Sequence, residues 1–391
     1  MSSRSQRYWI LLLGAIIALG PLTIDTYLPS LPTIQKDLST TATAVQLTIS
    51  AYFIGLAISQ LVWGWITDRF GRRRPLLTGM LLYSAASFAC AFAPNIGVLI
   101  GARVVQALGG AAGVVIVRAI VRDLWSGRDT ARVMSSLILV MGVAPVVAPS
   151  LGGALLAAFG WRAIFVLLGA AGALAFALVS LSLTETASDG EKSESALRAA
   201  GRVLTDRTFL AYALSGSFSM AGIFCYISGA PFVFIDIYEL SPTWFAVLFG
   251  ANAAGFVIAS QINRVLLQTR DHINLLRAAL VCTVVSGTGL AWAGWAVAPL
   301  WLLLPVLFLY MSTIGFTLPN TTAAAMDPHG PRAGIASALL GTLQYGIAAL
   351  SSAGTSAFAQ TTPRPMVNAM LLNAVLAISC LLIAPRRTPV I

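Results

Sequence analysis

Long apolar stretches alternate with short polar or charged segments along the whole chain. Each apolar stretch is about 20 residues long, which is the length an α-helix needs to cross roughly 30 Å of hydrocarbon. We expect helices, with ends accurate to about 2–4 residues, at 8–28, 44–66, 75–93, 96–121, 132–156, 162–183, 208–236, 243–267, 273–297, 299–322, 332–357 and 364–384. The pattern therefore predicts an all-α membrane protein with twelve transmembrane helices.

The longest polar interruption runs from Thr184 to Arg207 and divides the expected helices into six and six. We expect an N-terminal six-helix bundle at 1–183, a cytoplasmic linker at 184–207 and a C-terminal six-helix bundle at 208–391. Two fused, pseudo-symmetric halves of this kind place a substrate cavity near the middle of the membrane. The alternative is that this segment is simply a long loop.

Composition excludes a water-soluble fold, because 58% of the residues are hydrophobic and only 10% are charged. The net charge of +10 also has a local explanation. Lys36, Arg162 and Arg364 would face outward, Arg103 and Arg118 lie inside helices, and the remaining Lys and Arg fall on the cytoplasmic side. We therefore expect a multi-pass protein of a bacterial-type inner (plasma) membrane with both termini in the cytoplasm, and no nucleic-acid partner.

The segment between the second and third expected helices reads GWITDRFGRRRPLL from Gly64 to Leu77. This signature loop resembles the Gly-x-x-x-Asp-Arg-x-Gly-Arg-Arg motif of the major facilitator superfamily. The resemblance implies a role in switching between inward-open and outward-open states. A simple cytoplasmic anchor would explain the arginines but not the ordered Gly, Asp and Gly. The residues assigned to switching here are Gly64, Asp68, Arg69, Gly71, Arg72 and Arg73.

Two further segments resemble motifs of the same superfamily. Leu99 to Ala112 reads LIGARVVQALGGAA and resembles its Arg-x-x-Gln-Gly segment, with Ala107 at the final Gly position. Gly142 to Gly153 reads GVAPVVAPSLGG and resembles the motif associated with antiport, with Ala148 replacing a Gly. Small residues allow close helix contact in membranes. Pro149, Gly152 and Gly153 therefore join the residues assigned to switching.

Several other segments resemble the bicyclomycin- and chloramphenicol-resistance branch of the drug:proton antiporters with twelve spans. They are PLTIDTYLPSLPTI (21–34), QLTISAYFIGLAISQ (46–60), VRDL (121–124), WRAIF (161–165) and GAPFVFIDIY (229–238). The resemblance implies an antiporter that exchanges protons for small lipophilic or amphiphilic drugs. Its expected partners are those drugs, protons and the lipid bilayer. We expect a monomer without cofactor or metal, and the drug is not identified.

Asp25 is the strongest candidate for proton coupling, with Arg103 as its expected partner. Both residues lie at a similar depth, on the first and fourth helices, which both line the central cavity in this fold. Low-dielectric surroundings favour a protonated carboxyl and a nearby guanidinium favours the carboxylate, so the two effects oppose each other. The pair could instead be a static ion pair. Arg118 could be an anchor near the loop, and Asp236 is the next acidic candidate.

Aromatic and amide side chains on the cavity helices are candidates for substrate binding, because aromatic faces give adaptable contacts and a few polar groups orient a ligand. Each could also face lipid or the core. They are Tyr27, Tyr52, Phe224, Tyr226, Asn252, Tyr310, Gln344 and Tyr345.

Other chemistry finds little support in the sequence. Cys90, Cys225, Cys282 and Cys380 are isolated within apolar stretches and are expected to be small buried packing residues. His272 and His329 are expected in solvated loops. No Ser-His-acid set or phosphate loop supports a membrane enzyme, and no selectivity signature supports a channel. An exporter of a sugar, amino acid or other metabolite on the same fold stays open.

Overall fold

The computed structural model describes residues 3–125, 127–186, 196–358 and 362–384, and the regular structure within them is helical. The first half contains α1 (Ser3–Asp25), η1 (Leu28–Ser30), α2 (Leu31–Asp37), α3 (Ala42–Phe70), α4 (Arg73–Ala91), α5 (Ile96–Leu124), α6 (Gly127–Phe159) and α7 (Trp161–Ser182). It is followed by α8 (Ala196–Thr205), α9 (Arg207–Pro231), the π-helical segment η2 (Phe232–Ile237), α10 (Pro242–Leu266), α11 (His272–Trp295), α12 (Leu300–Met326), η3 (Asp327–Arg332), α13 (Ala333–Ser356), α14 (Arg364–Cys380) and η4 (Leu381–Ile383).

Each of the twelve expected membrane helices has a counterpart, and the all-α membrane fold is confirmed. Among the described residues, 11 helices are long and apolar enough to cross a membrane. The remaining expected span corresponds to α4, which has 19 residues and begins with Arg73 and Arg74. These two arginines reduce its hydropathy, although the helix packs on α5 and α7 like a full member of the bundle.

The first expected span, 8–28, corresponds to α1, and the chain continues beyond it in a short second helix that the sequence did not predict. α1 ends at Asp25, a turn and the short η1 follow, and α2 then continues to Asp37. Pro29 and Pro32 lie in this stretch, and proline cannot donate the backbone hydrogen bonds of a helix interior. The carboxylate of Asp37 accepts a hydrogen bond of 2.9 Å from Nε1 of Trp161, which joins the end of α2 to the start of α7.

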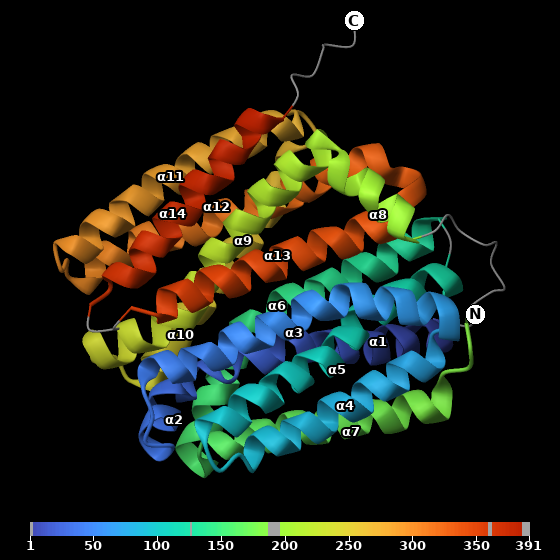
Figure 1. Ribbon diagram of the computed structural model, residues 1–391, viewed down its shortest axis with the longest axis horizontal. Coiled ribbons are helices and arrows are strands. Elements are labelled where there is room, and N and C mark those ends of the chain that lie inside the picture. The colour runs from blue at the N-terminus through green and yellow to red at the C-terminus, as the bar shows by residue number, and fades with distance from the viewer. Residues whose placement is uncertain (1–2, 126, 187–195, 359–361, 385–391) are drawn as a thin grey trace, which may run out of the picture. The chain divides into compact units, whose positions relative to one another are not determined.

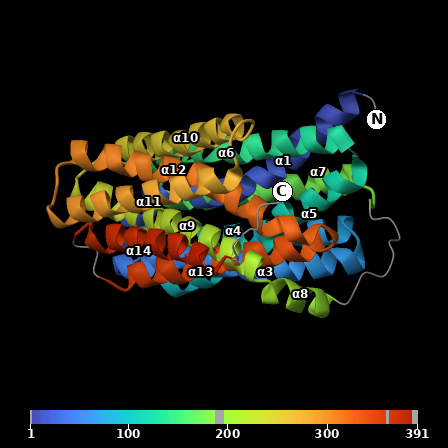
Figure 2. The ribbon, with the colours of Figure 1, turned by 90° about the horizontal axis from the view of Figure 1, so that it is seen from above.

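The chain divides into two compact units. The first comprises the described residues of Met1–Glu191 together with Pro231–Ala253, and the second those of Lys192–Ala230 together with Ala254–Ile391. In the first unit, α5 packs on both α3 and α4, α4 also packs on α7, and α1 packs on α6 (Figure 1). In the second unit, α11 packs on both α12 and α14 (Figures 1 and 2).

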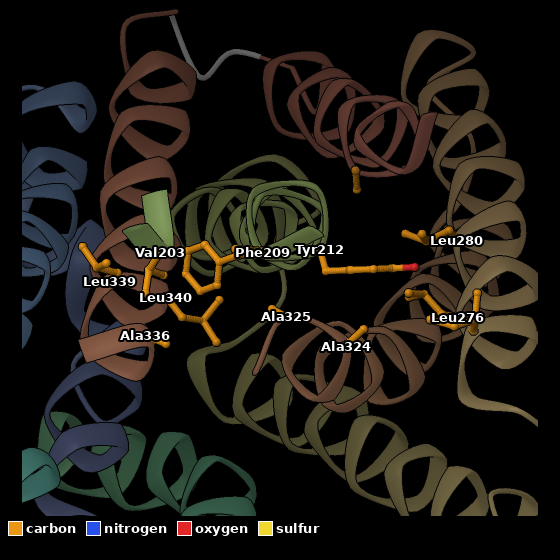
Figure 3. Packing of buried hydrophobic residues seen from close by; sticks show 13 residues of the cluster. Val203, Phe209, Tyr212, Leu276, Leu280, Ala324, Ala325, Ala336, Leu339 and Leu340 are labelled. Atoms are coloured by element: carbon orange, nitrogen blue, oxygen red, sulfur yellow. The ribbon is translucent and has the colours of Figure 1, made fainter. Parts of the chain in front are cut away.

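The segment expected to be a linker contains the helix α8, which packs on α13 within the second unit. Val203 of α8 is fully buried in a hydrophobic cluster with Phe209, Leu339 and Leu340, as Figure 3 shows. The sequence of α8, ALRAAGRVLT, places apolar residues at helical spacing between arginines. The second part of the expected linker is therefore a helix, α8, that belongs to the core of the second unit.

Two expectations about individual side chains are wrong. His329 is buried rather than solvated, because it packs edge-on against Phe209 with ring centroids 5.5 Å apart, and its Nε2 lies 3.1 Å from Oδ2 of Asp206. Cys282 is exposed rather than buried, since α11 directs it away from its neighbouring helices, whereas Cys90, Cys225 and Cys380 are buried as expected.

Candidate functional site

Asp25 is the last residue of α1 and lies at the break in the first membrane segment. Its side chain is only 4% exposed. The next residue, Thr26, is held to α1 by hydrogen bonds from both its backbone nitrogen and its hydroxyl to the carbonyl oxygen of Leu22, at 3.1 and 2.6 Å. The carboxyl therefore sits at the carbonyl end of a helix inside the first unit, where the helix dipole is negative.

Arg103 lies on α5 and is completely buried. Its Nη1 donates to Oε1 of Gln106 at 2.7 Å and to the carbonyl oxygen of Thr23 at 3.3 Å. The guanidinium carbon lies 4.3 Å from the ring centre of Tyr52 and 4.8 Å from that of Tyr27, which is cation–π distance. Arg103 thus ties α5 to the carbonyl end of α1.

The expected ion pair between Asp25 and Arg103 is wrong for this structure. Within the described residues, no ion pair or hydrogen bond joins the two side chains, and Nε and Nη2 of Arg103 have no hydrogen-bond partner. The guanidinium is directed elsewhere: its Nη1 donates to Thr23 and Gln106, and its plane lies against the rings of Tyr27 and Tyr52. Arg103 holds the helix that carries Asp25 rather than the carboxyl itself.

The signature loop is organised around a carboxylate from outside the motif. Oε1 of Glu185 accepts a hydrogen bond of 2.7 Å from the backbone nitrogen of Arg72, and Oε2 accepts one of 3.3 Å from that of Arg73. These nitrogens lie at the start of α4, where unpaired backbone donors and the positive end of the helix dipole favour an anion. Gly71 ends α3 at a φ of 81°, which suits a residue without a side chain.

The arginines of the loop make three different kinds of contact. Nε of Arg72 lies 3.0 Å from Oδ2 of Asp123 on α5. Arg73 donates to the carbonyl oxygens of Leu183 and Ser180 at the end of α7, at 2.6 and 2.9 Å. Arg69 is exposed and lies 5.8 Å from the ring centres of Trp65 and Phe70. The side chain of Asp68 lies outside the described residues, and Gly64 has open space around its Cα.

The antiport-like segment lies within α6, which contains Pro145 and Pro149. A Cβ atom on Gly152 would collide with the backbone of Thr26, the residue that follows Asp25. Gly153 has no such neighbour, since the nearest atom to a Cβ there is the carbonyl oxygen of Pro242 at 3.9 Å. Gly152 therefore allows α6 to touch the broken end of α1.

The aromatic candidates are distributed over both units. Tyr27 and Tyr52 enclose Arg103, and the hydroxyl oxygen of Tyr27 lies 2.7 Å from Oγ1 of Thr48. Phe224 and Tyr345 form a pair with ring centroids 6.2 Å apart, and Gln344 lies beside that pair in the sequence and is half-buried. The remaining candidates are buried, and they are Tyr226, Asn252 and Tyr310. Their roles in binding stay predictions.

Sequence reasoning missed the residues that hold Arg103 in place. Gln106 was detectable, because it is the glutamine of the Arg-x-x-Gln segment and lies one helical turn from Arg103. Thr23 binds Arg103 through its backbone carbonyl oxygen. Phe165 belongs to α7 and packs on Tyr27, with the two ring centroids 5.2 Å apart. Both residues lie in segments that carry the family resemblance, but nothing in the sequence indicates that they lie beside Arg103.

Within the described residues, no group of three or more His, Cys, Asp or Glu side chains is placed to hold a metal ion. The site is therefore built from one buried carboxyl, one buried guanidinium and their aromatic and hydroxyl neighbours.

Comparison with known proteins agrees with this architecture. The family model described as Major Facilitator Superfamily matches residues 11–353. An uncharacterized MFS-type transporter of Bacillus subtilis is 41% identical over 371 residues, covering 93% of this chain and 92% of that protein. A bicyclomycin resistance protein homolog of Haemophilus influenzae is 30% identical, covering 94% and 93%. A chloramphenicol resistance protein of Pseudomonas aeruginosa is 29% identical, covering 82% and 75%.

A solved structure shows the same fold. It is a bacterial homolog of the human lysosomal transporter Spinster in an inward-facing and occupied conformation, with a TM-score of 0.75, 16% identity, and coverage of 98% of this chain and 95% of that one. Since the family model spans most of the sequence and close relatives match along nearly their full length, the chain is a transporter of the major facilitator superfamily, related to the bicyclomycin- and chloramphenicol-resistance proteins.

Proposed function

We propose that this transporter is a proton-coupled antiporter that exports small lipophilic or amphiphilic drugs across the bacterial inner membrane by alternating access. Protons move inward as the drug moves outward. The proposal includes a six-plus-six division of the helices into two rocking bundles, and both termini in the cytoplasm. Relatives named for resistance to bicyclomycin and chloramphenicol support the substrate class.

The observation that carries the proposal is the carboxyl of Asp25. It is 4% exposed within an apolar span, and no ion pair or hydrogen bond to its carboxyl is found within the described residues. Ionisable groups inside membrane spans are costly and usually functional. A carboxyl without a charge partner can exchange a proton as its access to water changes, which is what a coupling residue must do.

Arg103 contributes by holding the end of α1 rather than by neutralising Asp25. Because its Nη1 binds the carbonyl oxygen of Thr23, a movement of α5 is transmitted to the residues next to Asp25. Gly152 of α6 touches the same end of α1 at Thr26. The environment of the carboxyl can therefore respond to the rearrangement of several helices at once.

The membrane potential can drive such a cycle. Moving one charge through 100 mV is worth roughly 2.3 kcal/mol, and about 1.4 kcal/mol corresponds to a tenfold change in an equilibrium constant. A cationic drug could compete with the proton at Asp25, whereas a neutral drug would be coupled through the conformational change. In both cases the signature loop would control the switch between the two states.

The test is transport by the purified protein in proteoliposomes that contain a pH-sensitive dye. Addition of chloramphenicol to the wild-type protein is expected to cause a drug-dependent proton flux. Asp25→Asn is expected to insert and fold normally but lose this flux, and Asp25→Glu is expected to keep part of it. Asp236→Asn is the matched control, since Asp236 is an exposed acid near the end of another span.

The outcomes separate the alternatives. Full coupled efflux by Asp25→Asn, together with loss in Asp236→Asn, would move the coupling role to Asp236. Proton flux that responds to sugars or amino acids but to no drug, including bicyclomycin, would favour a metabolite exporter on the same fold. A wild-type protein that shows no flux with any solute would end the antiporter proposal.

A further inference from the structure

Tyr83 of α4 is fully buried in a slot made by glycines of two neighbouring helices. A Cβ atom on Gly172 of α7 would lie 2.6 Å from Cδ1 of the tyrosine ring. One on Gly110 of α5 would lie 3.2 Å from Cδ2, and one on Gly109 would lie 2.7 Å from the Cα of Tyr83. The absence of side chains at these three positions lets the phenol pass between α5 and α7.

The hydroxyl at the end of this ring reaches α1. Oη of Tyr83 lies 2.6 Å from Oγ1 of Thr23. Oγ1 of Thr23 donates its own hydrogen to the carbonyl oxygen of Leu19 at 2.5 Å. Because a hydroxyl has a single hydrogen, Tyr83 must be the donor and Thr23 the acceptor in the bond between them.

Thr23 is consequently held at two points by two helices. Tyr83 of α4 donates to its hydroxyl, and Arg103 of α5 donates to its carbonyl oxygen at 3.3 Å. Thr23 precedes Asp25 by two residues on the last turn of α1. With both contacts in place, the last turn of α1 has a fixed position relative to α4 and α5.

We propose that Tyr83 is a positioning residue for Asp25: its hydroxyl fixes the turn of α1 that presents the carboxyl, so that proton binding stays coupled to drug movement. This role rests on the proposed antiport function. Packing alone does not require the hydroxyl, since a phenylalanine would fill the glycine slot equally well. Contact with α7 does not require it either, because the adjacent Ser84 already donates to the carbonyl oxygen of Gly169 at 2.7 Å.

The experiment measures protons moved per chloramphenicol molecule exported in proteoliposomes, for wild-type protein, Tyr83→Phe, Thr23→Val and the double variant. Ser84→Ala is the matched control, because it removes a buried hydroxyl from the same helix without touching α1. A purely structural defect lowers both fluxes together and leaves their ratio unchanged. Loss of positioning lowers the ratio itself.

We expect Tyr83→Phe to lower the ratio by about threefold or more, because the loss of one net hydrogen bond shifts the equilibrium between a fixed and a displaced end of α1 by about that factor. Thr23→Val should produce the same loss, because it removes the same bond between α4 and α1, in addition to a bond within α1 to Leu19. The double variant should lower the ratio no further, since the bond between the two helices can be lost only once. Ser84→Ala should keep the wild-type ratio.

If the wild-type protein couples protons to drug, two results would overturn the role of Tyr83 and leave the antiport function in place. One is an unchanged ratio of protons to drug in Tyr83→Phe, and the other is an equal decrease of that ratio in Ser84→Ala. A wild-type protein that moves no protons with drug would instead overturn the antiport function, and the role of Tyr83 with it.

Discussion

The carboxylate of Glu185 occupies the space that a side chain on Gly71 would fill. A Cβ atom built on Gly71 would lie 2.6 Å from Cδ of Glu185. Gly71 also has a φ of 81° and a ψ of −168°, a combination that is essentially restricted to glycine. The second glycine of the signature loop therefore satisfies two demands at once, a backbone conformation and room for the acid that caps α4.

Gly71→Ala is expected to destabilise the protein by about 1–3 kcal/mol, because the backbone is strained and Glu185 is displaced from α4. The measurement is the thermal unfolding midpoint of the purified protein in detergent. Gly64→Ala is the matched change in the same motif. It lies in a helix with nothing within 4 Å of its Cβ, so its midpoint should stay the same or rise. A lower midpoint in Gly64→Ala than in Gly71→Ala would contradict this account.

Gly152→Ala should destabilise the folded protein by about 1–3 kcal/mol, since overpacked contacts cost energy of this order. The expected result is a lower thermal unfolding midpoint and a lower yield of folded protein. The atoms in the way belong to the backbone of Thr26 and cannot rotate aside. Gly153→Ala provides the comparison one residue away, because its Cβ would meet only an ordinary contact at 3.9 Å. Equal stability of the two variants would show that α6 does not approach α1 through Gly152.

Arg103→Ala is expected to reduce drug-dependent proton flux about tenfold or more, because hydrogen bonds to charged groups contribute about 1.5–3 kcal/mol. The change leaves Thr23 and Gln106 without their shared donor. Arg118→Ala on the same helix should have little effect, since its side chain is exposed. Equal flux from the two variants in proteoliposomes would argue against the role of Arg103 at the end of α1.

Val203→Asp should destabilise the second unit by about 3–5 kcal/mol, the cost typical of an uncompensated buried charge. Val203 is 0% exposed, whereas its neighbour Leu204 on α8 is 41% exposed. Leu204→Asp should therefore have a much smaller effect. The rate of limited proteolysis within α8 and the thermal unfolding midpoint report whether α8 has lost its contact with α13. If both variants unfold at the same temperature, α8 is not part of this core.

Much of the fold was readable from the sequence because a membrane span depends on local composition. The expected span 243–267, for example, corresponds to α10 at Pro242–Leu266. The break at Asp25 and the helix α8 were harder to predict. Apolar residues continue past the break as far as Ile34, and α8 gains its stability from contacts with Leu339 and Leu340 of α13, which are distant in sequence.

The contacts of the candidate site residues could not be predicted from the sequence. The motifs singled out Arg103 and Asp25, and a depth argument placed them together. The depth of two residues on neighbouring helices does not determine which donors and acceptors meet, and Nη1 of Arg103 donates to Thr23 and Gln106 instead. Glu185 could not be assigned to the signature loop either, since it lies more than 100 residues away along the chain.

The composition of α4 has a consequence for the biogenesis of the protein. This helix begins with two arginines and is not among the 11 helices of the described residues that are long and apolar enough to cross a membrane. The hydroxyls of Tyr83 and Ser84 find their partners on α1 and α7, and Ser87 is bound by Gln106 of α5. A newly made α4 lacks two of these neighbours, α5 and α7, until later parts of the chain are synthesised. The polar side chains of α4 therefore obtain their full set of partners only after α5 and α7 have been made, and we expect the final placement of α4 in the membrane to depend on the helices that follow it.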